Sequence, residues 1–213
     1  MKGIYLVTDQ MACTHHSLET IVLMAIQAGV SCVQLREKTA DTRTFIQRAL
    51  ALKAILKPAR VPLIINDRVD IALAAGADGV HIGQSDMPYP MARRILGPDA
   101  LIGLSVETWA DVVAAQDLDL DYIGVSPVFS TPTKTDTKDP WGLAGLARIN
   151  DYSRHPLVAI GGLNADNTVP VVTAGADALA VVSAICSARD PFEAAQTLCT
   201  HFNHTRTSQG TPS

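Results

Sequence analysis

Two aspartates stand where the sequence could hold a metal ion. Asp67 follows the short apolar run of residues 63–65, and Asp86 follows a second run at residues 79–83. Runs of this length and composition are typical of buried strands, so each acid would lie just beyond a strand end. Two carboxylates from neighbouring strands suit Mg²⁺, which takes one or two protein carboxylates and completes its coordination with water and phosphate oxygens.

Three cations accompany the two acids. Gln34, Arg36 and Lys38 recur at every second position, which places them on one face of a strand for as far as that strand persists. Lys134 belongs to the long polar segment of residues 127–140. Guanidinium and ammonium groups donate charge-assisted hydrogen bonds to phosphate oxygens. Acids that hold a metal, with cations beside them, indicate a site for a diphosphate.

A second anion site is predicted further along the chain. Gly161 and Gly162 precede one expected helix, and Val182 and Ser183 precede another. Glycine lets a backbone approach an anion closely, and helix N-termini present N–H groups that have no partner within the helix. In barrels of alternating strands and helices, the loops after the seventh and eighth strands frequently hold a phosphate. The whole site would therefore accept two phosphorylated groups.

These residues need a scaffold that gathers many strand ends. Apolar runs alternate with helical patterns along the chain and predict eight strands. They are residues 3–7, 32–36, 63–65, 79–83, 101–106, 122–126, 157–160 and 178–182. Eight strand–helix units in 213 residues are typical of a small single-domain (β/α)8 TIM barrel, an α/β fold whose site lies at the carboxyl ends of its strands.

The barrel is expected to span residues 1–203. Its last helix should run from residue 191 to about 202, and we expect the polar residues 204–213 to form a disordered tail. The same patterns predict a helix over residues 69–75 that ends at Gly76, which can adopt a left-handed conformation.

Composition argues against several classes of partner. The net charge is −4 and basic residues do not cluster, so nucleic acid is not expected. Apolar runs stop well short of the ~20 residues that a membrane span needs, so we expect a cytoplasmic protein without membrane contact. The four cysteines form no CxxC pair and are expected to be reduced thiols. The oligomeric state is left open, a homo-oligomer included.

The chain resembles the thiamine-phosphate synthase family in eight stretches. They are YLVTD (5–9), QLREK (34–38), IND (65–67), GVHIGQSD (79–86), IGLSVET (102–108), GVSPVFSTPTK (124–134), AIGGL (159–163) and AVVSAI (180–185). AIGGL also occurs in other phosphate-binding barrels, whereas QLREK, HIGQSD and TPTK in this order are specific to the family.

The resemblance implies a transferase of thiamine biosynthesis, in the class that moves alkyl or aryl groups other than methyl. It would join hydroxymethylpyrimidine diphosphate to a thiazole phosphate, releasing diphosphate and using Mg²⁺. The residues implied for the pyrimidine diphosphate are Gln34, Leu35, Arg36, Glu37, Lys38, Asn66, Ser105 and Lys134. Those implied for the thiazole phosphate are Thr131, Pro132, Thr133, Gly162, Val182 and Ser183. The implied metal ligands are Asp67 and Asp86.

The implied mechanism agrees with the charges that the residues supply. Loss of diphosphate leaves a delocalised pyrimidinylmethyl cation, so catalysis must stabilise the departing charge and exclude water. We interpret four residues as catalytic: Arg36, Lys38, Lys134 and Ser105. The segment of residues 127–140 would close over the site. No general base is needed, because the attacking thiazole nitrogen carries no proton to remove.

Each feature also has a purely structural interpretation. A lone loop aspartate often caps a helix, and Gly161-Gly162 alone is commonly a turn. His81 is interpreted as an interior or rim histidine with satisfied hydrogen bonds. Arg68 follows the IND motif where some family members carry another acid, which would alter the outer surroundings of the metal.

Two other functions compete with the synthase. A related thiazole tautomerase would place a histidine near the sixth strand, where this chain has Gly124-Val125-Ser126-Pro127. A regulatory barrel that only binds a phosphorylated ligand would have no use for a second subsite with acids and cations.

Overall fold

Eight parallel strands close into a barrel in the computed structural model, which describes residues 1–131 and 138–209. They are β1 (Gly3–Val7), β2 (Cys32–Leu35), β3 (Leu63–Asn66), β4 (Gly79–Ile82), β5 (Leu101–Val106), β6 (Tyr122–Val125), β7 (Leu157–Ile160) and β8 (Ala178–Val181). Each strand pairs with the next, and β1 pairs with β8 to complete the ring. The predicted fold class is confirmed.

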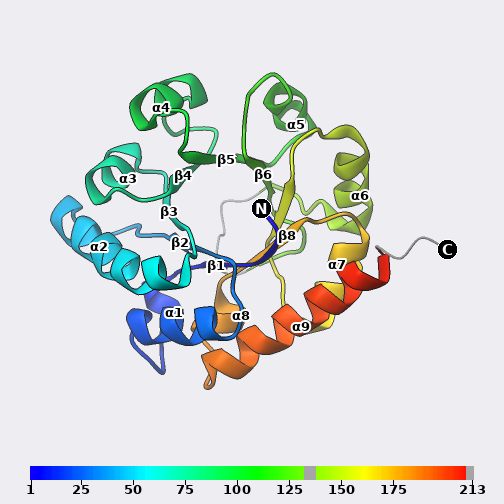
Figure 1. Ribbon diagram of the computed structural model, residues 1–213. Coiled ribbons are helices and arrows are strands. Elements are labelled where there is room, and N and C mark those ends of the chain that lie inside the picture. Colours follow the sequence, from blue (N-terminus) through cyan, green and yellow to red (C-terminus); the bar gives the residue numbers. More distant parts are fainter. Residues whose placement is uncertain (132–137, 210–213) are drawn as a thin grey trace.

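Helices surround the barrel (Figure 1). They are α1 (Leu18–Gln27), α2 (Thr42–Ala59), α3 (Val69–Ala75), α4 (Tyr89–Leu96), α5 (Trp109–Ala115), α6 (Gly142–Tyr152), α7 (Thr168–Thr173), α8 (Ser183–Cys186) and α9 (Pro191–Gln209), with 3₁₀ turns η1 (Gln10–Ala12) and η2 (Ala165–Asn167). In the part of the chain that the structure describes, no helix is both long and apolar enough to cross a membrane.

The strands are apolar on both faces because both faces are buried. Ile4 and Leu6 of β1 point outward into a large core shared with the helices, whereas Tyr5 and Val7 point into the barrel. This alternation follows from the two-residue period of a strand. A strand in this fold therefore needs an unbroken apolar run, and an inward-facing polar residue within such a run marks the barrel interior.

Local signals fix several element ends, and the end of α3 is the predicted one. Helix α3 ends at Gly76, whose φ of 57° is left-handed. The Ser17 hydroxyl accepts from the Thr20 N–H at 3.2 Å and caps α1. Thr108 and Asp111 form a capping box at the start of α5. Such caps satisfy the first N–H groups of a helix, which have no partner within it.

The expected disordered tail is wrong for residues 204–209, because α9 continues to Gln209. Thr205 is buried, and its hydroxyl donates to the His201 carbonyl at 2.8 Å. Arg206 pairs with Asp177 at 3.4 Å, which ties the last turn to the loop before β8. Tertiary contacts thus extend a helix whose sequence looks polar and frayed. Residues 210–213 lie outside the described part of the chain.

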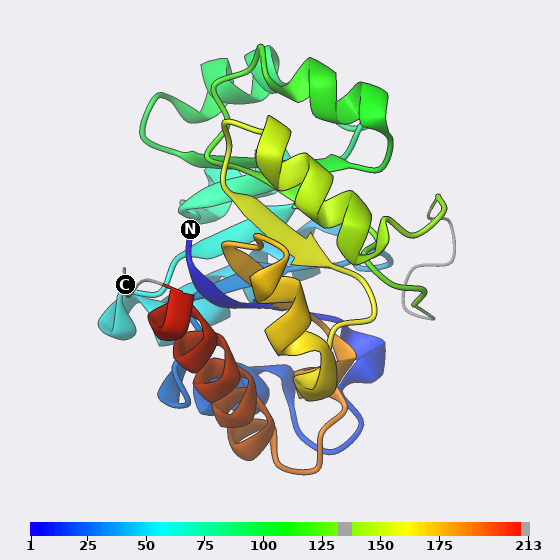
Figure 2. The ribbon, with the colours of Figure 1, turned by 90° about the vertical axis from the view of Figure 1, so that its right-hand side faces the viewer.

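All strand carboxyl ends face one side of the barrel, because all eight strands are parallel. In Figure 2 the yellow arrow of β7 points toward that side. The loops that follow the strands meet there, so the predicted polar residues are brought to one place.

Candidate functional site

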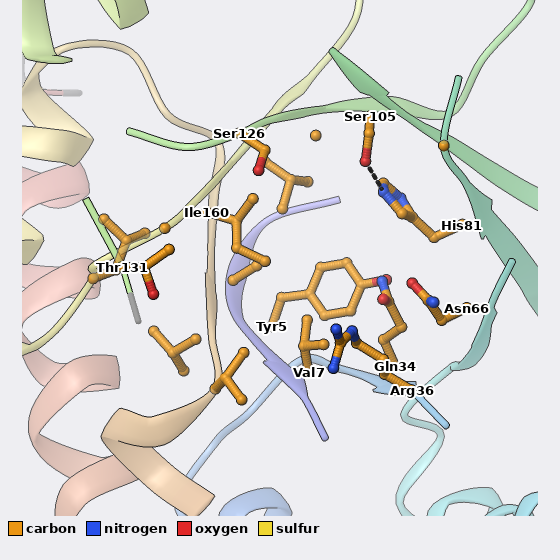
Figure 3. A pocket seen from close by; sticks show the side chains of 18 of the residues that line it. Tyr5, Val7, Gln34, Arg36, Asn66, His81, Ser105, Ser126, Thr131 and Ile160 are labelled. Carbon is orange, nitrogen blue, oxygen red and sulfur yellow. Dashed lines mark hydrogen bonds between the residues drawn. The ribbon is translucent and has the colours of Figure 1, made fainter. Parts of the chain in front are cut away.

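A cavity of about 770 Å³ opens at the carboxyl ends of the strands. Each of the eight strands contributes at least one residue to its wall, and the loops after the strands form its rim. Figure 3 shows side chains from β1, β2, β3, β4 and β5 converging on it. A cavity at this end of a β/α barrel is where ligands bind in the fold.

Most of the predicted site residues line this cavity. They are Gln34, Arg36, Lys38, Asn66, Asp67, Asp86, Ser105, Thr131, Gly162, Val182 and Ser183. Three predicted residues, Pro132, Thr133 and Lys134, lie outside the described residues, as does the middle of the expected closing segment, since residues 132–137 are not described.

The side chains of Leu35 and Glu37 do not line the cavity. Leu35 is fully buried in the core between strands and helices, and the Glu37 carboxylate pairs with Arg48 at 2.7 Å. The physical reason is alternation: Gln34, Arg36 and Lys38 face the cavity, so the residues between them face away. Any contact that these two residues make with the pyrimidine diphosphate would come from their backbone, and their part in binding it stays a prediction.

Asp67 and Asp86 lie close together at the ends of β3 and β4. Asp86 accepts a hydrogen bond from the Gly83 N–H at 2.7 Å, and Lys38 Nζ donates to Asp67 Oδ2 at 2.7 Å. The pKa of Asp86 is raised, mainly by burial and further by the charge of Asp67, although the Gly83 N–H opposes the shift. Because the two carboxylates repel each other, a cation bound beside them would be stabilised.

This pair fits Mg²⁺ by its donor set. Among residues 1–131 and 138–209, no group of three or more histidines, cysteines or acids is placed to hold a metal ion. The protein would therefore supply two carboxylate ligands and leave the other positions to water and phosphate oxygens, an arrangement that Mg²⁺ favours. Asp67 has a left-handed φ of 64°, a conformation that aspartate tolerates better than most residues.

Arg36 is held at the same side of the cavity by the end of β1. Its backbone N–H donates to the buried Thr8 hydroxyl at 3.0 Å, and its guanidinium lies 3.6 Å from the Asp9 carboxylate. Strand β2 has ended by this point, so Thr8 takes over the positioning of the chain. Lys38 thus places positive charge beside the acid pair, and Arg36 adds a second cation to the cavity wall.

The opposite side of the cavity is built from backbone. Gly161 and Gly162 have positive φ values of 106° and 64°, and an added Cβ at Gly162 would lie 2.9 Å from Phe129 Cβ. The Phe129 N–H donates to the Gly161 carbonyl at 3.1 Å, so the loop after β6 rests against this turn. Val182 precedes α8, and Ser183 begins it. This side lacks the acidic pair and offers small residues and backbone groups.

The floor of the cavity holds a chain of polar side chains that joins the predicted site residues Gln34 and Ser105 through two tyrosines and His81. Gln34 Nε2 donates to Tyr5 Oη at 2.9 Å, and Tyr5 Oη lies 2.9 Å from Tyr122 Oη. Tyr122 Oη lies 3.1 Å from His81 Nδ1, and His81 Nε2 lies 2.8 Å from Ser105 Oγ. The bond between His81 and Ser105 is drawn in Figure 3. His81 is therefore an interior histidine, and its hydrogen bonds reach a predicted site residue.

A sequence signal for this floor does exist. Tyr5 and Tyr122 stand within strands of apolar residues, and a buried tyrosine usually finds a partner for its hydroxyl. The partner depends on how strands at different positions around the barrel face one another, which periodicity along one strand does not reveal.

Comparisons with known proteins agree with this site. A family model described as thiamine monophosphate synthase matches residues 4–185. The thiamine-phosphate synthase of Albidiferax ferrireducens is 57% identical over 192 residues, which cover 90% of this chain and 88% of that protein. The corresponding protein of Leptospira biflexa is 55% identical over 206 residues, 95% of this chain and 98% of its own length.

A solved structure extends the likeness to three dimensions. The thiamine phosphate pyrophosphorylase from Pyrococcus furiosus has a TM-score of 0.87 and 33% sequence identity, and the match covers 95% of this chain and 96% of that one. The family model, the relatives and the structure agree on one assignment. The chain belongs to the thiamine monophosphate synthase family.

Proposed function

We propose that this chain joins hydroxymethylpyrimidine diphosphate to a thiazole phosphate and releases thiamine phosphate and diphosphate. The overall reaction, a transferase step of thiamine biosynthesis, follows from family membership. The observation that carries the proposal is a single cavity with two unlike sides. One side has the acid pair with cations, and the other has the Gly161-Gly162 turn and the start of α8.

The acid pair and the cations would hold the diphosphate. Asp67 and Asp86 would bind Mg²⁺, which supplies positive charge to the leaving diphosphate when it is bound. Arg36 and Lys38 donate to phosphate oxygens from the same side of the cavity. Lys134 remains a predicted third cation.

The chain's own groups then favour departure of the diphosphate. Breaking the carbon–oxygen bond moves negative charge onto the leaving group, toward Arg36 and Lys38, and leaves a delocalised pyrimidinylmethyl cation. Fixed charges placed where charge develops lower the barrier, because they need not reorganise. The apolar walls formed by Val158 and Ile160 keep water from the cation. Asn66 and Ser105 would bind the pyrimidine diphosphate from the adjoining wall.

The thiazole phosphate would lie on the backbone side. Gly162 and the amides of Val182 and Ser183 line this part of the cavity, together with Thr131. Small residues allow backbone N–H groups to approach a phosphate closely. Pro132 and Thr133 remain predicted members of this subsite. The thiazole nitrogen would attack the exposed carbon and needs no base.

The test is release of diphosphate from hydroxymethylpyrimidine diphosphate, measured with and without thiazole phosphate and with and without Mg²⁺. We expect release to need both additions and thiamine phosphate to appear in equal amount. Isomerisation of the thiazole phosphate without diphosphate release would favour a tautomerase instead. Binding without any turnover would favour a regulatory barrel.

A further inference from the structure

The floor of the cavity contains four hydrogen bonds in series, from Gln34 on β2 to Ser105 on β5. Tyr5 and Tyr122 are fully buried, and both rings reach toward the barrel axis. In Figure 3 Tyr5, Gln34, His81 and Ser105 surround the same space. Gln34 and Ser105 are predicted to bind the pyrimidine diphosphate, whereas Tyr5, Tyr122 and His81 have no predicted role, so these three need an explanation.

The donors and acceptors along this series can be assigned by counting protons. The Gln34 amide nitrogen can only donate, so Tyr5 Oη accepts from it at 2.9 Å. A phenol has one proton, and Tyr5 can give it to Tyr122 Oη at 2.9 Å. Tyr122 then gives its own proton to His81 Nδ1 at 3.1 Å. Burial raises the pKa of both phenols, so both keep the protons that this assignment uses.

The assignment determines which nitrogen of His81 is protonated. If Nδ1 accepts from Tyr122, a neutral imidazole carries its proton on Nε2. Nε2 then donates to Ser105 Oγ at 2.8 Å. The Ser105 hydroxyl accepts this bond and keeps its own proton for an acceptor in the cavity.

The opposite direction is less favourable. Tyr5 Oη would then accept from both Gln34 and Tyr122, and its own proton would be left to the buried Cys32 thiol beside it. All four bonds of the series persist in this direction, and the change lies in the proton at its end. Tyr5 gives that proton to sulfur, a weak acceptor, whereas in the first direction Ser105 gives it to an acceptor in the cavity.

The backbone is shaped to hold the two central rings. A Cβ added at Gly103 of β5 would overlap the ring of Tyr122, and one added at Gly124 of β6 would lie 2.9 Å from His81 Cε1. The rings of His81 and Tyr122 stack at 5.5 Å with an interplanar angle of 17°. Tight packing of this kind limits the rotamers of both side chains.

We propose that Tyr122 and Tyr5 are positioning residues that hold His81 with its proton on Nε2 and so present the Ser105 hydroxyl to the substrate as a hydrogen-bond donor. The inference deepens the proposed function, on which the identity of the ligand, the pyrimidine diphosphate, rests. The acceptor of the Ser105 hydroxyl proton is a lone pair on the pyrimidine ring or on the ester oxygen of this ligand. Tyr5 and Tyr122 act through His81 and are not themselves catalytic.

The first test does not depend on turnover. Long-range ¹H–¹⁵N correlation spectra of the ¹⁵N-labelled full chain report which histidine nitrogen carries a proton, and a His81→Gln variant identifies the His81 signals. We expect the Nε2–H form in the unmodified protein. Tyr122→Phe keeps the ring but removes the donor, so His81 should become a mixture of tautomers. Tyr5→Phe, one step further away, should give a smaller change.

A control variant separates this effect from loss of any phenol. Tyr89 Oη donates to the Asp119 carbonyl at 2.6 Å outside the cavity. Tyr89→Phe should leave the His81 signals unchanged. An Nδ1–H or doubly protonated His81 in the unmodified protein would overturn the inference, as would a Tyr122→Phe spectrum identical to that of the control.

The second test is kinetic. Loss of one well-oriented hydrogen bond should raise the KM for the pyrimidine diphosphate about tenfold in Tyr122→Phe and leave the KM for the thiazole phosphate within about twofold. Equal rises in both would indicate general loosening and contradict a positioning role. If the chain forms no thiamine phosphate at all, the proposed function fails, but the tautomer measurement still decides the inference.

Discussion

At the scale of single residues, Asp86 shows most clearly how charge is arranged in the site. It is partly buried beside Asp67, and both effects raise its pKa. Burial and the charge of Asp67 destabilise the ionised form of Asp86 in the ligand-free protein, and a bound cation would stabilise it. If Mg²⁺ binds here as proposed, Asp86 links the stability of the fold to binding of the metal.

Replacing either acid should remove most of the activity. We expect Asp67→Asn and Asp86→Asn each to lower Mg²⁺-dependent turnover by about 100-fold or more, since each removes one charge from the metal site. Asparagine preserves shape, and at position 67 it also tolerates a left-handed φ. Circular dichroism should show an intact fold. Near-normal rates in both variants would remove the metal assignment.

The raised pKa of Asp86 also predicts how stability depends on pH. An acid whose pKa is higher in the folded chain stabilises the fold below its unfolded pKa of about 3.9, and this contribution is lost as pH rises through the folded value. Ligand-free Asp86→Asn has no carboxyl group at this position to ionise, so it should not lose this contribution to stability as pH rises. Its free energy of unfolding at neutral pH should therefore be higher than that of the unmodified protein. Urea denaturation at several pH values measures the difference. A lower value at neutral pH would contradict the assigned charge arrangement.

At the scale of elements, close packing between β5 and β6 positions the cavity floor. Gly103 leaves room for the Tyr122 ring, which no other residue type would do at this position. Gly103→Ala should lower the free energy of unfolding by ~1–3 kcal/mol, as overpacking does. A Gly103→Ala/Tyr122→Leu double variant should lose less than the sum of the two single changes, because the smaller side chain removes the clash. Strict additivity in urea denaturation would show that the two positions do not interact.

Element positions could largely be predicted from the sequence, and the exceptions have physical causes. Helix α3 has its predicted limits, because apolar residues and Gly76 mark both ends. The four-residue helix α8 was not predicted, since one turn shows no periodicity. The end of α9 was placed too early because burial of Thr205 depends on packing against distant elements.

The site residues likewise divide into those that the sequence predicts and those that it does not. Residues at strand ends, such as Asp67 and Asp86, could be predicted, because a barrel brings all strand ends together whatever its detailed register. The series through Tyr5, His81 and Tyr122 could not, because it depends on contacts across the barrel interior. The resemblance implies that the whole QLREK stretch binds the pyrimidine diphosphate, and the alternation within it predicts that the side chains of Gln34, Arg36 and Lys38 face the cavity.

At the scale of the whole molecule, one cavity combines two proposed phosphate subsites of different chemistry. The proposed diphosphate side has carboxylates and cations, so binding there should require a divalent ion. The opposite side uses the Gly161-Gly162 turn and the start of α8, so binding there should not. The closed barrel fixes the two sides relative to each other.

The most direct measurement is calorimetric titration of each substrate alone, with and without Mg²⁺, into the unmodified protein and into Asp86→Asn. We predict that hydroxymethylpyrimidine diphosphate binds tightly only with Mg²⁺ and only to the unmodified protein. Thiazole phosphate should bind both proteins with an affinity that Mg²⁺ does not change. Mg²⁺-independent binding of the diphosphate, or loss of thiazole phosphate binding in Asp86→Asn, would contradict the two-subsite account.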